Sequence, residues 1–199
     1  MDMKKLLKLL AIAGITLIAM SSCCNNSSTE SAAAQAVLDN ISSRTSIRKF
    51  TSDPVSEEEI EKVLRAAMCA PSAMNSQPWR FVVVRDKAIL ASMAEKMPYA
   101  RLDTAPVAIV VCGDQSGYCK FWEHDCSAAA ENILLAAHAL GLGGVWTAAS
   151  DEKRAPIVTE ELGLPSFIRP LCVIPLGHPA ENPEPKNKWN PENIHYDKW

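Results

Sequence analysis

The chain has 199 residues, of which 48% are hydrophobic and 22% are charged, and its formal net charge is -3. This size and composition fit one ordinary globular domain with a buried core and do not indicate a second domain. The chain lacks the broad basic excess typical of nucleic-acid-binding proteins, so we expect no nucleic-acid partner. Any site for an anion must therefore be local.

The first residues have the anatomy of an export signal. Lys4, Lys5 and Lys8 precede an apolar run over 9–20, which is followed by small residues and then Cys23. The run is too short to indicate a membrane-spanning helix. Residues 20–23, MSSC, resemble the bacterial lipobox, in which the cysteine becomes the lipidated first residue of the mature protein. Cys24 is the rival acceptor, and a plain cleaved signal or an apolar helix is the alternative interpretation.

These features predict a signal peptide over 1–22, a lipid-anchored flexible linker over 23–38 and a folded domain over 39–199. The linker assignment rests on the neutral, Ser- and Ala-rich composition of NNSSTESAAAQA. We expect a membrane-anchored lipoprotein of the bacterial cell envelope, on the periplasmic or outer-membrane face.

Five further cysteines are present, and their odd number and irregular spacing do not form a disulfide framework. One or two disulfide bridges remain possible after export. A zinc site at Cys119, His124 and Cys126 would lack a second ligand pair of the usual spacing, so we expect no bound metal. Small buried thiols are the preferred interpretation of these cysteines: Cys69, Cys112, Cys119, Cys126 and Cys172.

Helical patterns alternate with a few buried strands along the rest of the chain. Periodicity and end signals predict helices over 56–67, 88–96, 125–140 and 152–162, and strands over 79–85, 106–112 and 171–176. The first helix opens with the cap candidate Ser56 and acidic residues. The helix over 125–140 is rich in small residues and ends at the C-cap candidate Gly141, which favours a central position or a subunit contact. The pattern indicates a mixed α/β or α+β domain in which helices cover a sheet.

The chain ends in a proline-rich arm, which begins at Gly177. The glycines over 141–144 do not form a dinucleotide-binding fingerprint, because they follow a helix and their spacing differs from G-x-G-x-x-G. They predict a tight reversal between the helix over 125–140 and a strand. No Ser/His/Asp set or pair of carboxylates indicates a catalytic side chain.

Two short segments carry the strongest chemical signals. In SSRTSIRKF (42–50), Arg44, Ser46 and Arg48 alternate, so that an extended backbone would direct them to one side. Arginine and serine are natural donors to phosphate oxygens, although a solvated basic turn is the alternative. In APSAMNSQPW (70–79), Asn75 and Gln77 offer amide donors and acceptors that can read the edge of a heterocycle. A structural turn would explain its prolines and serines equally well, but it explains the whole string poorly.

Together, RTSIRKF and APSAMNSQPWRFVVV resemble the nitroreductase family of FMN-dependent oxidoreductases, whose members carry an R-x-S-x-R/K element and a P-S-x-x-N-S-Q-P-W loop. The likeness continues through the Ala-rich helix, ALGLGGVW and a Lys-x-Lys element, and covers roughly residues 39–199. The resemblance implies an α+β, three-layer fold with a mainly antiparallel central sheet covered by helices. It also implies an intertwined homodimer that holds FMN at its interface.

The resemblance assigns four groups of residues to the FMN site. The basic element would address the phosphate and, through Arg48, the flavin pyrimidine ring, while the proline-serine loop would come from the partner chain. Backbone groups after Trp146 would face flavin N5. The lysines near the C-terminus would bind phosphate, and an exposed charge cluster is their alternative interpretation. The implied residues are Arg44, Thr45, Ser46 and Arg48; Pro71, Ser72, Ala73 and Asn75; Thr147, Ala148 and Ala149; and Lys186 and Lys188.

The implied activity is ping-pong reduction of a nitroaromatic, a quinone or a related small molecule, with NADH or NADPH as the hydride donor. Such chemistry needs orientation of two planar rings rather than a side-chain acid or base. A specialised flavin reaction such as reductive dehalogenation or flavin fragmentation is one alternative, and a non-catalytic flavin-binding lipoprotein is another. Arg101 is a weak candidate for a further flavin contact. Export conflicts with an intracellular NAD(P)H supply, so the natural electron donor is open.

Overall fold

The computed structural model describes residues 26–118 and 120–199. The predicted signal over 1–22, the candidate lipidation site Cys23, its rival Cys24 and Cys119 lie outside these residues. The chain divides into two units, one ending at Ser42 and the other formed by Ser43–Trp199. The helices and strands are α2 (Asn26–Ser43), α3 (Glu57–Met68), η1 (Ala73–Asn75), β1 (Trp79–Val84), α4 (Lys87–Lys96), η2 (Pro98–Ala100), β2 (Val107–Asp114), α5 (Trp122–Ala139), β3 (Gly143–Gly144), β4 (Thr147–Ala148), α6 (Ala155–Leu162), β5 (Ile168–Gly177) and η3 (Pro191–Asn193).

Helix α2 differs from the flexible linker predicted over 23–38. The described chain is helical from Asn26 onward, because the alanines over 32–36 favour a helix more strongly than the neutral composition favours an irregular tether. The predicted start of the folded domain, Asp39, lies within α2. The role of residues 23–38 as a linker stays a prediction, and no described helix is long and apolar enough to cross a membrane.

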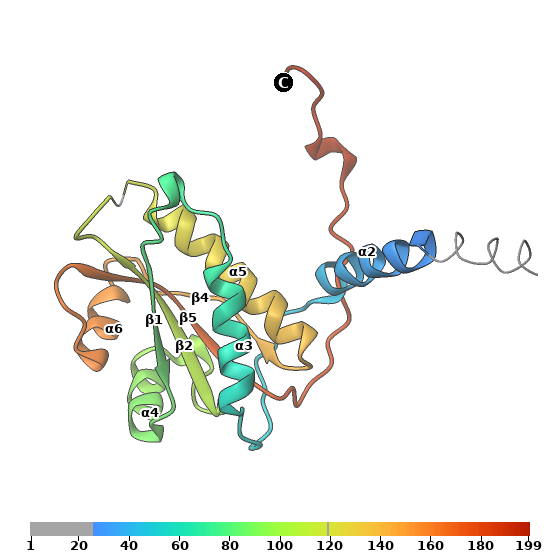
Figure 1. Ribbon diagram of the computed structural model, residues 1–199. Coiled ribbons are helices and arrows are strands. Elements are labelled where there is room, and N and C mark those ends of the chain that lie inside the picture. The colour runs from blue at the N-terminus through green and yellow to red at the C-terminus, as the bar shows by residue number, and fades with distance from the viewer. Residues whose placement is uncertain (1–25, 119) are drawn as a thin grey trace, which may run out of the picture. The chain divides into compact units, whose positions relative to one another are not determined.

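Five strands form one sheet in the second unit. Their order is β1-β2-β5-β3, with β4 also paired to β5, and every pairing is antiparallel. Helices α3 and α5 pack on one face, and α4 and α6 pack on the other (Figure 1). This confirms the predicted α+β, three-layer architecture with a mainly antiparallel sheet.

Strand β2 is buried on both faces of the sheet. Ile109 and Val111 join the apolar cluster beneath α3 and α5, while Ala108 and Val110 join the cluster beneath α4 and α6. Successive side chains of a strand point to opposite faces, so a strand covered by helices on both sides needs an unbroken apolar sequence. The run PVAIVVC is therefore the consequence of a central position.

The start of α3 and the end of α5 follow the predicted signals. Ser56 caps α3 in a capping box with Glu59: the Glu59 backbone N–H donates to the Ser56 side chain, and the Glu59 side chain accepts from the Ser56 N–H. Helix α5 ends in a Schellman motif, in which Gly141 adopts a φ of 77° and the N–H of Leu142 donates to the carbonyl of Ala137. The predicted helix over 152–162 begins only at Ala155.

Buried thiols are confirmed for three of the predicted cysteines. Cys112, Cys126 and Cys172 are free and buried, whereas Cys69 is free and exposed. Burial raises the pKa of the Cys112 and Cys126 thiols to about 12 and raises the pKa of Cys172 as well. These buried thiols therefore behave as small apolar core residues rather than as nucleophiles.

The segment preceding α3 docks closely against β3. The Ile47 N–H donates to the carbonyl of Gly144 at 3.0 Å, and the Ile47 side chain is buried. A Cβ atom added at Gly143 would lie 2.6 Å from Ile47 Cβ. Gly143 thus permits the close approach of the basic element 42–50 to the sheet.

We expect Gly143→Ala to destabilise the protein by about 1–3 kcal/mol, because the added methyl group must displace Ile47 from a packed contact. Urea unfolding of the purified domain measures the change. Gly117→Ala is the matched control: nothing lies within 4 Å of a Cβ at Gly117. Equal losses of stability in the two variants would show that the Ile47 contact is loose.

Candidate functional site

The beginning of the basic element is held by one face of α5. Arg44 Nε lies 3.7 Å from Glu131 Oε1, and the Arg44 side chain is only 16% exposed. One residue earlier, Ser43 Oγ lies 2.8 Å from His138 Nε2. Glu131 and His138 are seven residues apart on α5, a spacing that places them on the same face. Arg44 is thereby fixed beside the helix and is not a freely solvated cation.

The middle of the basic element is held by the root of the C-terminal arm. Glu181 Oε1 accepts hydrogen bonds from the backbone N–H groups of Arg48 at 2.6 Å and Lys49 at 3.2 Å. Phe50 forms an antiparallel bridge with Pro179. These contacts consume backbone donors and leave the Arg48 side chain exposed, so its guanidinium remains available to a ligand.

Lys186 and Lys188 are exposed on the arm beyond Glu181. An extended chain of five residues spans at most about 18 Å, so Lys186 lies within this reach of the Glu181 contact to the basic element. The structure joins the root of the arm to the basic element. Among the described residues, no contact joins Lys186 or Lys188 to Arg44.

Strands β3 and β4 are the two ends of one edge strand along β5, because both pair with it in the same register. By this register Pro175 of β5 lies opposite Val145, which lies between β3 and β4. Proline has no N–H, so Pro175 cannot donate the hydrogen bond that would continue the ladder between β5 and this edge strand. The Ala149 N–H donates to the Leu171 carbonyl at 2.8 Å. In an antiparallel pair the neighbouring residue faces the other way, so the N–H and C=O of Ala148 point to the open edge.

The open edge at Ala148 agrees with the predicted role of 147–149 as a source of backbone donors. Thr147 and Ala149 are buried and Ala148 is half-buried. The basic element lies beside the same edge, since Ile47 bonds to Gly144 three residues before Thr147. The structure therefore brings together the basic element, the edge at 147–149 and the root of the arm.

The loop over 70–77 is a strained and internally bonded unit. Met74, Asn75 and Gln77 have φ values of 56°, 53° and 48°, the left-handed region that non-glycine residues seldom adopt. The Asn75 N–H donates to the Ser72 carbonyl at 3.0 Å. The Gln77 N–H donates to Ser72 Oγ at 3.1 Å.

The internal bonds of this loop determine which groups remain for a ligand. Asn75 Oδ1 already accepts a hydrogen bond from Gln77 Nε2 at 3.2 Å, so the exposed Asn75 side chain offers its NH₂ group as a donor. Ser72 Oγ already accepts from the Gln77 N–H, so its hydroxyl can donate outward. The loop therefore presents donors, which suits a ligand rich in acceptor atoms.

Sequence reasoning missed the residue that connects this loop to α5. Asp125 is 7% exposed, and its carboxylate accepts hydrogen bonds from the Ala73 N–H at 2.9 Å and from Ser76 Oγ at 3.5 Å. In the sequence, Asp125 is only an acidic residue in the first turn of an alanine-rich helix. The helix dipole alone explains an acidic residue at that position.

The structure does not bring the loop to the basic element within one chain. Asp125 and Asn132, which bonds to the Ala66 carbonyl at 2.9 Å, are seven residues apart and share the face of α5 toward α3. Glu131, which pairs with Arg44, lies about 120° away around the helix axis. The two predicted halves of the site are thus fixed to different faces of α5.

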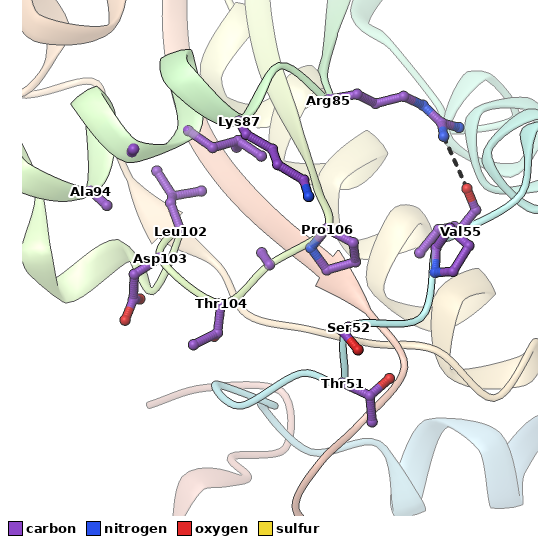
Figure 2. A pocket seen from close by; sticks show the side chains of 14 residues that line it. Thr51, Ser52, Val55, Arg85, Lys87, Ala94, Leu102, Asp103, Thr104 and Pro106 are labelled. Atoms are coloured by element: carbon purple, nitrogen blue, oxygen red, sulfur yellow. Dashed lines mark hydrogen bonds between the residues drawn. The ribbon is translucent and has the colours of Figure 1, made fainter.

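A cavity of about 670 Å³ opens elsewhere, between the segment after the basic element and α4. Its floor includes the buried side chains of Val55, Leu90 and Leu102. Figure 2 shows Arg85 turned away toward the Val55 carbonyl, to which it donates at 3.0 Å. None of the predicted FMN-binding residues lines this cavity.

Metal chemistry has no support in the described part of the chain. Over 26–118 and 120–199, no group of three or more His, Cys, Asp or Glu side chains is arranged to hold a metal ion. His124 is exposed and Cys126 is buried, so these two members of the considered zinc pattern do not share one environment. The third member, Cys119, lies outside the described residues.

Comparison with known proteins places this arrangement in a family. The model of the Nitroreductase family matches residues 41–98 and 94–178. A protein of Methanothermobacter thermautotrophicus is 48% identical over 167 residues, which are 82% of this chain and 87% of that protein. A crystal structure from Bacteroides thetaiotaomicron is 50% identical and has a TM-score of 0.80, with 82% of this chain and 98% of that chain covered. Both carry the name "Putative NADH dehydrogenase/NAD(P)H nitroreductase".

A third relative of known structure, from Clostridium difficile, is described as an FMN-dependent nitroreductase. It is 31% identical with a TM-score of 0.76, and the match covers 81% of this chain and 99% of that chain. The two motifs, the helix-covered antiparallel sheet and these matches agree. The chain belongs to the nitroreductase family.

Proposed function

We propose that this protein is an FMN-dependent oxidoreductase that uses NADH or NADPH to reduce a small acceptor, such as a nitroaromatic compound or a quinone. The relatives named NAD(P)H nitroreductase and FMN-dependent nitroreductase support the cofactor and the reaction type. The observation that carries the proposal is the set of groups offered by the site. Arg44 and Arg48 supply positive charge, while Ser72, Asn75 and the Ala148 backbone supply neutral donors.

These groups fit FMN in chemical character. A dianionic phosphate suits guanidinium groups, which form charge-assisted hydrogen bonds. The flavin ring carries several acceptor atoms at its edge, and the donors of Ser72 and Asn75 can bind them. Arg48 would offset negative charge at the pyrimidine end of the ring, and the Ala148 N–H would hold the ring edge at the open side of β4.

Bound FMN would supply the hydride chemistry, accepting a hydride from the nicotinamide and passing reducing equivalents to the second molecule. The protein's tasks are to orient the rings and to stabilise charge. This division of labour accounts for a site in which no acid and base pair is needed.

The arrangement on α5 supports a site shared by two chains. One chain holds Arg44 on one face of α5 and the 70–77 loop on another face. A homodimer would allow the loop of one chain to meet the basic element of its partner, as the family resemblance implies. Each site would then be incomplete in a single chain.

The enzyme hypothesis predicts that NADH or NADPH bleaches protein-bound FMN in an anaerobic stopped-flow experiment. Adding a quinone or a nitroaromatic compound to the reduced protein should restore the visible absorbance, because the two substrates use the site in turn. A protein that binds FMN but remains oxidised with both donors would instead be a flavin-binding module.

A shared site predicts complementation between two damaged chains. Homodimers of Arg44→Gln and of Asn75→Ala should each lose most activity, because each lesion affects both sites. A hybrid dimer with one chain of each kind, purified through two different tags, would contain one undamaged site and should recover about half of wild-type activity. Hybrids as inactive as the parent homodimers would show that both residues serve the site of their own chain.

We also propose that Cys23 carries a lipid and anchors the protein to the cell envelope, which rests on the sequence MSSC after an apolar run. Fatty-acid labelling in a bacterial host should mark the wild-type chain and the Cys24→Ala variant. Cys23→Ala should abolish labelling, because the thioether to the lipid needs that thiol. Labelling that persists in Cys23→Ala and disappears in Cys24→Ala would move the anchor to the rival cysteine.

A further inference from the structure

We infer that Asp125 is a positioning residue that fixes the 70–77 loop so that Ser72 and Asn75 face the cofactor of the partner chain. This inference rests on the proposed function. Its direct basis is the pair of hydrogen bonds from the Ala73 N–H and the Ser76 hydroxyl to the buried Asp125 carboxylate.

The middle of the loop is attached to α5 through Asp125, while its two ends bond to Ala67 and Arg80. The other hydrogen bonds of residues 72–76 stay within the loop, between Ser72, Ala73, Asn75, Ser76 and Gln77. They make the loop a stiff unit but do not set its orientation. The two bonds to Asp125 lead out of this unit and fix it to α5.

Backbone strain makes such an attachment necessary. Met74, Asn75 and Gln77 lie in the left-handed region, where each non-glycine residue costs free energy that the surroundings must offset. Such a conformation persists only where contacts hold it, and the bonds to Asp125 add an anchor outside the loop to the bonds within it. The relaxed loop would carry Ser72 and Asn75 away from their productive direction.

The charge of Asp125 strengthens this attachment. No ion pair of the described residues includes Asp125, so its burial is offset by neutral donors and by the N-terminal turn of α5, whose dipole favours an anion. Hydrogen bonds to a carboxylate are stronger than those to a neutral acceptor. A neutral amide of the same shape would hold the loop less firmly.

The first test measures FMN binding by fluorescence quenching in the full folded domain without its signal, residues 25–199. Asp125→Ala should raise the Kd for FMN about 10- to 100-fold, and Asp125→Asn should give a smaller increase, since the amide keeps one acceptor. Asn132→Ala is the matched control, because it removes an α5–α3 hydrogen bond on the same helix face. It should lower thermal stability and leave the FMN Kd within about twofold. Equal increases in Kd for Asp125→Ala and Asn132→Ala would overturn the inference.

The second test uses hybrid dimers and separates positioning from general damage. Asp125→Ala paired with Arg44→Gln should recover about half of wild-type activity, whereas Asp125→Ala paired with Asn75→Ala should recover none, because both lesions then affect loops. Failure of both pairings, while Arg44→Gln with Asn75→Ala does recover, would mean that Asp125 acts on the whole subunit and would overturn the inference. Failure of that reference pairing would instead refute the shared site. Asp125→Asn replaces Asp125→Ala if the alanine variant does not fold.

Discussion

Helix α5 has to satisfy two partners at once, and the arrangement of the site depends on this constraint. One face carries Glu131 and His138, which hold the start of the basic element. Another face carries Asp125 and Asn132, which hold the 70–77 loop and α3. A helix is stiff over a few turns, so these contacts keep the two elements at a fixed separation. The small residues between them, such as Ala129 and Ala130, let the helix pack closely against the sheet.

The chemistry of the site follows from what the backbone leaves unpaired. Pro175 of β5 interrupts the ladder to the edge strand, and within residues 26–118 and 120–199 no further strand pairs with the edge at Ala148. Glu181 accepts from the backbone N–H groups of Arg48 and Lys49, and the Arg48 side chain is exposed. The donor groups therefore come from a strand edge and a strained loop, and their proposed value for a flavin lies in their fixed directions.

The sequence predicts the long elements well because their signals are local. Ser56 caps α3 as predicted, and the apolar run over 106–112 marks the buried strand β2. The two-residue strands β3 and β4 have no periodicity to detect. The neutral composition over 23–38 favours a tether, although its alanines favour the helix α2. Asp125 was beyond prediction because its bond to Ala73 joins residues far apart in the chain.

The left-handed residues at 74, 75 and 77 have a consequence for protein engineering. Each strained position costs on the order of 1 kcal/mol, which is a substantial part of the margin by which a domain of this size is stable. Glycine at Met74 or Gln77 would relieve that cost and raise the melting temperature, while it would also loosen the segment that carries the proposed donors Ser72 and Asn75. Selection for heat resistance alone would therefore erode ligand recognition in this scaffold, and a useful library should hold these three positions constant.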